Sequence, residues 1–145
     1  MGGMSQSFTD KLAARIKETG SALCVGLDPR PGMDDLEAIP ALLRKVAYFE
    51  AMGLRGLEIL EDLLPDMPKD VPVVLDAKRG DIGETQKYYA HAYFERLGVD
   101  AVTLSPFMGY DTLEPFLNYE GKGVYLLAVT SNPGSADVER QELAG

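Results

Sequence analysis

Short, fully apolar segments alternate with stretches of helical spacing along this chain, and this alternation constrains the fold most strongly. Apolar residues dominate the segments 22–27, 71–75, 101–104 and 124–130. A strand that is apolar on both faces must be covered on both faces, which is typical of a parallel sheet flanked by helices. The sequence therefore predicts an α/β fold with about four parallel strands.

The helices expected between these strands are bounded by glycine, proline and polar residues. The first carries Phe8, Leu12 and Ile16 on one face and ends at Gly20. The others are expected at residues 40–52, 57–64, 84–97 and 111–119, and from residue 136 onwards. No strand is expected within residues 40–52, because the apolar spacing there stays helical. We treat residues 1–145 as a single domain, since no repeat, linker or low-complexity tract divides them.

The composition excludes several classes of partner. A net charge of −9 repels phosphates, so neither nucleic acid nor an anionic membrane surface is an expected partner. The apolar runs are far shorter than the roughly 20 residues that a bilayer span needs. The single cysteine, Cys24, cannot form an intrachain disulfide, which favours a cytoplasmic protein, and its apolar surroundings predict that it is buried. The single histidine, His91, has no partner that would make it a metal ligand.

The chemistry concentrates after the second predicted strand, where two carboxylates bracket a lysine. Side chains alternate along an extended strand, so Asp76 and Lys78 project to the same side at the carboxyl edge of the sheet. A carboxylate about 4 Å from an ammonium contributes roughly 4 kcal/mol at an effective dielectric constant near 20. Lys78 should therefore be a charged acid, suited to stabilising and then protonating a carbanion. An ordinary surface cluster of ion pairs is the alternative.

Four motifs in this sequence closely resemble those of the orotidine 5′-phosphate decarboxylases, in particular the bacterial form with Asp-Ala-Lys-Arg-Gly-Asp. They begin at Cys24, Asp76, Thr103 and Ala128, and they read Cys-Val-Gly-Leu-Asp-Pro, Asp-Ala-Lys-Arg-Gly-Asp-Ile-Gly, Thr-Leu-Ser-Pro and Ala-Val-Thr-Ser-Asn-Pro-Gly. The resemblance implies a dimeric (β/α)₈ barrel that converts orotidine 5′-phosphate to uridine 5′-phosphate in pyrimidine biosynthesis, without metal or organic cofactor. A complete barrel typically needs about 250 residues, so 145 residues predict a partial TIM barrel.

The resemblance also assigns roles to individual residues. Lys78 matches the proton donor, and Asp76 matches the carboxylate beside the substrate carboxylate. Asp28 matches an aspartate that contacts the ribose, and Ser131 matches a serine that contacts the pyrimidine. The stretch that completes the neighbouring subunit's site in a homodimer is matched by Asp81, Ile82 and Thr85.

Two departures from the family pattern predict that the isolated chain is a fragment with little or no decarboxylase activity. The family's second strand, which supplies another catalytic lysine, is expected to be absent here, as though an internal block of residues had been deleted. Lys45 is the nearest candidate to replace that lysine. The loops after strands seven and eight, which commonly bind phosphate in such barrels, are also missing. An inactive remnant that only associates is therefore one alternative. Another is a magnesium-dependent sugar-phosphate decarboxylase, in which Asp76 and Asp81 would hold the metal.

Overall fold

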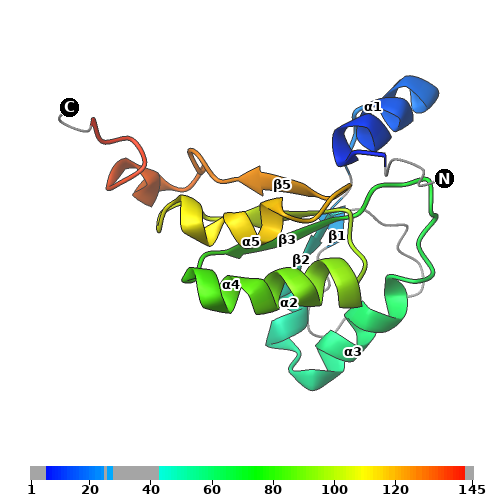
Figure 1. The fold of residues 1–145 in the computed structure, drawn as a ribbon, viewed down its shortest axis with the longest axis horizontal. Coiled ribbons are helices and arrows are strands. Elements are labelled where there is room, and N and C mark those ends of the chain that lie inside the picture. Colours follow the sequence, from blue (N-terminus) through cyan, green and yellow to red (C-terminus); the bar gives the residue numbers. More distant parts are fainter. Residues whose placement is uncertain (1–5, 25, 28–42, 143–145) are drawn as a thin grey trace.

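The computed structural model describes residues 6–24, 26–27 and 43–142, which form an open parallel sheet with helices (Figure 1). Five strands follow one another in the order of the sequence. They are β1 (Gly26–Leu27), β2 (Leu43–Lys45), β3 (Val74–Arg79), β4 (Ala101–Leu104) and β5 (Gly123–Leu126). Each strand pairs in parallel with the next one along the chain, as in a segment of a barrel. The predicted α/β class with parallel strands is confirmed.

The helices lie between the strands, as the alternating pattern predicts. They are α1 (Phe8–Thr19), α2 (Val46–Ala51), α3 (Leu54–Leu63), α4 (Gly83–Ala90) and α5 (Glu114–Leu117). The helix expected at residues 84–97 changes character midway, because a π-helix, η1 (His91–Arg96), continues α4. The 3₁₀ turn η2 (Tyr110–Thr112) precedes α5, and a further 3₁₀ turn, η3 (Pro133–Ala136), replaces the last predicted helix.

The second strand corrects the sequence prediction, which placed an uninterrupted helix at residues 40–52. Strand β2 lies between β1 and β3, and α2 begins only after it. Its register pairs Leu43 with Val74 and Lys45 with Asp76. A three-residue strand is too short to show a period of its own, and its neighbours on both sides come from distant parts of the sequence. The pairing that defines β2 is therefore invisible in the local pattern.

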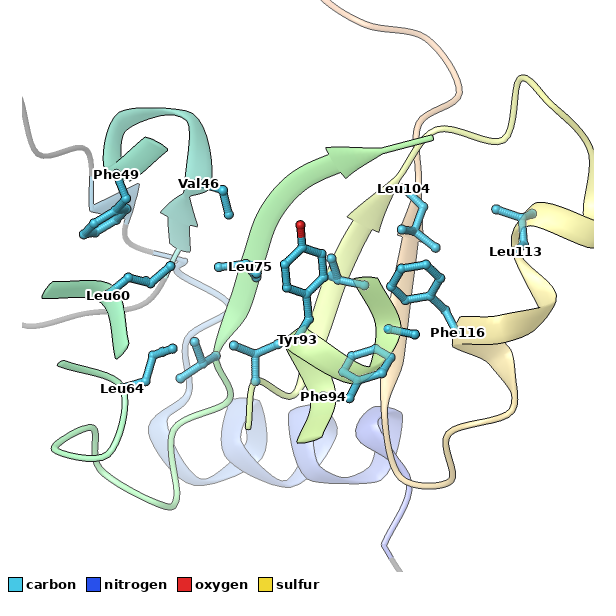
Figure 2. Close-up of a cluster of buried hydrophobic side chains, with 14 residues drawn as sticks. Val46, Phe49, Leu60, Leu64, Leu75, Tyr93, Phe94, Leu104, Leu113 and Phe116 are labelled. Carbon is cyan, nitrogen blue, oxygen red and sulfur yellow. The ribbon is translucent and has the colours of Figure 1, made fainter. Parts of the chain in front are cut away.

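The main core lies between the sheet and the helices α2 to α5 (Figure 2). Phe49 of α2, Leu75 of β3 and Phe116 of α5 are all 1% exposed or less. The aromatic rings of Phe94 and Phe116 meet edge to face, with their centroids 5.9 Å apart. Burying large apolar side chains against a sheet is the main source of stability in such a layer.

The other face of the sheet is covered in part by α1. Phe8 packs there with Val74 and Ala101, which alternate with the core-facing residues of β3 and β4. Gly123 of β5 allows this contact, because a Cβ atom on it would lie 2.3 Å from the Phe8 ring.

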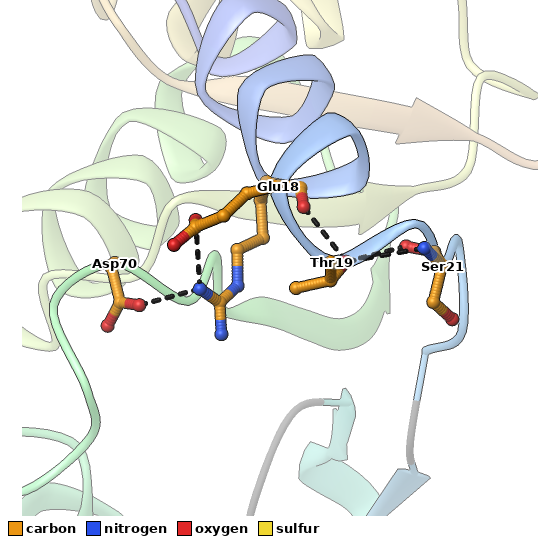
Figure 3. A network of polar contacts seen from close by, with 5 residues as sticks. Glu18, Thr19, Ser21 and Asp70 are labelled. Carbon is orange, nitrogen blue, oxygen red and sulfur yellow. Dashed lines mark hydrogen bonds and ion pairs between the residues drawn. The ribbon is translucent and has the colours of Figure 1, made fainter.

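Surface ion pairs hold α1 against the loop before β3 (Figure 3). The guanidinium of Arg15 donates to Asp70 at 2.7 Å and to Glu18 at 3.1 Å. A second pair joins the ammonium of Lys11 to Asp100 at 2.5 Å, and Asp100 also accepts the backbone N–H of Val73. Exposed pairs such as those of Arg15 contribute little individually, so they orient the helix more than they stabilise the fold.

The prediction that Cys24 is buried is wrong, because its side chain is exposed. Within the described residues of the predicted strand at 22–27, the strand is limited to β1 at an edge of the sheet, and residues 22–24 are exposed. An apolar run is buried only where a neighbouring element covers it. No helix in the described ranges is long and apolar enough to cross a membrane.

Candidate active site

A carboxylate and an ammonium meet at the carboxyl end of β3. The Nζ atom of Lys78 donates to both carboxylate oxygens of Asp76, each at 2.5 Å. The Asp76 side chain is 8% exposed, whereas the Lys78 side chain is 50% exposed. The carboxylate is therefore fixed inside the fold, while the ammonium has one side open to a ligand.

Thr103 of β4 completes this arrangement. Its hydroxyl donates to Asp76 Oδ1 at 2.8 Å and accepts the backbone N–H of Lys78 at 2.9 Å. One side chain thus orients both partners of the ion pair. Thr103 belongs to a motif that the sequence highlights, but only the pairing of β3 with β4 reveals this role.

Lys78 has an unusual backbone conformation, with φ at 47°. This left-handed region is uncommon for residues other than glycine, asparagine and aspartate. The register between β3 and β4 shifts between Leu75 and Arg79, so Lys78 lies within a β-bulge. Bulges and strained backbones are concentrated at functional sites, where they redirect a side chain.

Lys45 lies beside this pair in the backbone of the sheet. It is the last residue of β2, and its Cα is the register partner of Asp76. Its position at the carboxyl end of a strand differs from the helical position that the sequence predicts. The strand therefore brings a second lysine to the same edge as Asp76 and Lys78.

A second polar cluster surrounds Arg79, the residue that ends β3. Its Nε donates to the hydroxyl of Tyr93 at 2.6 Å, and its terminal nitrogen pairs with Glu50 of α2. The guanidinium carbon also lies 5.1 Å from the centroid of the Tyr89 ring. Figure 2 shows the hydroxyl of Tyr93 directed toward the carboxyl ends of the strands. Sequence reasoning missed this cluster, because its members come from separate elements.

The pKa values of this cluster are shifted by burial and by the pairing. Burial by itself lowers the pKa of Arg79, but its hydrogen bonds and charge interactions with Tyr93 and Glu50 outweigh burial and raise it. Burial also raises the pKa of Tyr93 above its ordinary value, although the neighbouring Arg79 opposes this. Both groups therefore keep their protons at neutral pH.

This shift predicts a pH dependence of stability above the ordinary tyrosine pKa of about 10. Because the folded-state pKa of Tyr93 is raised, its contribution is fully present below the unfolded-state pKa and is lost as pH rises through the folded-state value. We expect the free energy of unfolding of the unmodified chain to fall more steeply above about pH 10 than that of Tyr93→Phe. Urea titrations of both proteins across this range measure the difference, and parallel curves would contradict the prediction.

The remaining predicted site residues are spread more widely. Asp81 accepts the backbone N–H of Ile82 at 2.8 Å, and no hydrogen bond or ion pair in the described chain joins it to Lys78. Ile82 is 62% exposed before α4, and Thr85 is half-buried in the first turn of that helix. Ser131 is exposed in the segment after β5. Asp28 lies outside the described residues.

The described ranges contain no group of three or more histidine, cysteine, aspartate or glutamate side chains placed to hold a metal ion. His91 instead pairs through Nδ1 with Glu95, 3.2 Å away on the exposed side of η1.

The fold and the site together define a barrel-type α/β protein with a charged Asp-Lys pair at the carboxyl edge of its parallel strands. The profile described as "Orotidine 5'-phosphate decarboxylase / HUMPS family" matches residues 21–144, and the chain belongs to this family.

Known proteins of similar sequence carry the same family name. The orotidine 5'-phosphate decarboxylase of Verminephrobacter eiseniae is 46% identical over 160 aligned positions, which include 95% of this chain and 58% of the relative. The chain therefore spans less than two thirds of the length of this relative. An alignment of 160 positions also exceeds the 145 residues of the chain, so the relative has residues within the aligned region that this chain lacks.

Solved structures agree with this assignment. Leishmania donovani OMP decarboxylase superimposes with a TM-score of 0.83 at 40% identity, covering 95% of this chain and 60% of that one. Leishmania donovani UMP synthase gives a TM-score of 0.84 at 39% identity, covering 96% of this chain and 34% of that one. The expected partial barrel is therefore confirmed as part of the architecture of these proteins.

Proposed function

We propose that this chain carries the decarboxylating part of an active site for orotidine 5′-phosphate and catalyses its conversion to uridine 5′-phosphate. The observation that carries the proposal is the contact between Asp76 and Lys78 at the carboxyl end of β3. Membership of the family and the similarity to a decarboxylase support the choice of substrate.

The geometry suits a reaction in which a carbon–carboxylate bond breaks. Carbon dioxide leaves, the bonding electron pair stays on the pyrimidine carbon, and the ammonium of Lys78 supplies the proton that replaces the carboxylate. The fixed charge of Asp76 disfavours a neighbouring substrate carboxylate more than the product, while Lys78 stabilises the developing carbanion. Because Asp76 is nearly buried, its charge is less screened by water than a surface charge would be.

Lys45 supports the same proposal from the neighbouring strand. Its backbone lies opposite Asp76, so we propose Lys45 as the replacement for the second catalytic lysine that the family resemblance implies. The presence of β2 removes one of the two reasons for expecting an inactive chain.

The test is to incubate the purified chain with orotidine 5′-phosphate and follow the loss of orotate absorbance at protein concentrations comparable to the substrate. We expect slow loss of absorbance that is absent in Lys78→Ala. Parallel reactions with EDTA and with added Mg²⁺ should proceed at the same rate. A flat trace from the folded chain would contradict the proposal, and a requirement for Mg²⁺ would favour the sugar-phosphate decarboxylase instead.

We also propose that two copies associate through the turn before α4 and the loop after β4. Three apolar side chains are exposed there, namely Ile82, Phe107 and Tyr110, which are 62%, 81% and 69% exposed. The two segments lie together, since a Cβ atom on Gly83 would be 3.1 Å from the backbone oxygen of Asp111. An exposed apolar patch beside a functional site is typical of an association surface.

The single cysteine supports a cytoplasmic location.

Replacing Ile82 by aspartate should prevent this association, because a charge in the centre of an apolar contact has no partner there. We expect sedimentation velocity to show a dimer for the unmodified chain and a monomer for Ile82→Asp. The matched control is Leu54→Asp on α3, where the native side chain is 81% exposed and lies away from the patch. Equal sedimentation of all three proteins would contradict the proposed interface.

A further inference from the structure

Arg79 follows the strained residue Lys78 directly, and its side chain is held by three different elements. Tyr93 belongs to η1, Glu50 to α2 and Tyr89 to α4. The Arg79 side chain is 24% exposed, although it carries a full charge. A guanidinium fixed by a hydrogen bond, an ion pair and an aromatic ring has little freedom to move.

The backbone of Arg79 is fixed as well. Its carbonyl oxygen accepts the N–H of Ser105, the residue after β4, at 2.7 Å. This hydrogen bond restores pairing with the neighbouring segment of the sheet after the bulge. The bulge thus has one end anchored by Leu75, which is fully buried, and the other anchored by Arg79. Lys78 lies between these anchors, with φ at 47°.

A strained conformation persists only where the surrounding contacts determine it. On the amino side of the bulge, Thr103 binds both Asp76 and the N–H of Lys78. On the carboxyl side, the contacts of Arg79 supply the corresponding restraint. We propose that Arg79 is a positioning residue, whose contacts with Tyr93 and Glu50 hold Lys78 in the conformation that directs its ammonium onto Asp76.

The same contacts connect the two strands that carry lysines. Glu50 lies on α2, which begins immediately after Lys45, the last residue of β2. The Glu50–Arg79 pair therefore ties the element after β2 to the end of β3. The π-helix contributes to the contacts that fix Arg79, because it carries the Tyr93 hydroxyl that binds the Nε of Arg79.

The proposal rests on the proposed function for the role of Lys78, but its test needs no turnover. The acylation rate of each lysine by an N-hydroxysuccinimide ester of acetate is measured by peptide mass spectrometry in the unmodified chain and in Arg79→Met. We expect acylation of Lys78 to rise about fivefold in Arg79→Met, since an ammonium released from both oxygens of Asp76 is more accessible to the reagent.

Two internal controls separate positioning from general loosening. Lys87 is exposed and pairs with Glu84, so its acylation rate should stay unchanged. Arg96→Met removes an exposed arginine of η1 that pairs with Glu61, and it should leave Lys78 unchanged. Tyr93→Phe removes a single hydroxyl and should raise Lys78 labelling by a smaller factor.

Unchanged labelling of Lys78 in folded Arg79→Met would overturn the proposal. It would also be overturned if Lys87 labelling rose as much as Lys78 labelling in both Arg79→Met and Tyr93→Phe. If Arg79→Met does not fold, Tyr93→Phe decides the matter alone, and an unchanged Lys78 rate in that variant overturns it. A chain that labels as expected but fails to decarboxylate would contradict the proposed function while supporting the positioning role.

Discussion

Replacing Lys78 by alanine is expected to lower the rate of orotidine 5′-phosphate decarboxylation by this chain about a thousandfold. The substitution removes both the positive charge beside the developing carbanion and the proposed proton donor. Asp76, whose side chain is 8% exposed in the unmodified chain, then keeps Thr103 as its remaining side-chain hydrogen-bond donor in the described structure. We expect most of the loss in kcat, because the interaction is strongest when charge develops on the substrate carbon.

Lys87→Ala is the matched control for this experiment. Lys87 is also an exposed lysine in contact with a carboxylate, 2.7 Å from Glu84, but it lies on the outer surface of α4. The rate of Lys87→Ala should stay within about twofold of the unmodified chain, because exposed pairs contribute little. A rate for Lys78→Ala that also stays within about twofold would show that the Asp76–Lys78 contact is an ordinary surface ion pair.

Replacing Phe116 by alanine is expected to lower the free energy of unfolding by about 4 kcal/mol. Phe116 is 1% exposed, and its ring meets that of Phe94 edge to face. Truncation leaves a cavity between α5 and η1, two elements that contact the same side of the sheet. Unfolding in urea, followed by far-ultraviolet circular dichroism, measures the change.

Leu117, the next residue of α5, provides the control. Its side chain is 47% exposed, so Leu117→Ala should cost less than about 1 kcal/mol. If the two variants lost equal stability, the layer formed by α5 and η1 would not be packed as the structure shows. Together with the Lys78 variants, this pair separates residues that maintain the fold from residues that perform the chemistry.

The contrast between α1 and β2 shows which elements the sequence could predict. Helix α1 has its own period, a serine that caps its first turn and a glycine with φ at 65° after its last residue. These signals act within one helical turn and do not depend on the remainder of the chain. Strand β2 has three residues, and it forms only because β1 and β3 pair with it. The sequence prediction at residues 40–52 is wrong for that reason.

The candidate site divides in the same way. The sequence by itself determined the alternation of strands and helices and the family motifs that place Asp76 and Lys78 at the end of one strand, because these depend on spacing along the chain. Only the tertiary structure decided that Thr103 bridges the pair, that Lys45 aligns with Asp76, and that Arg79 binds Tyr93 and Glu50. These contacts join residues from separate strands and helices. Their partners are set by the order of strands in the sheet, by the π-helix η1 and by the bulge in β3, none of which leaves a periodic trace in the sequence.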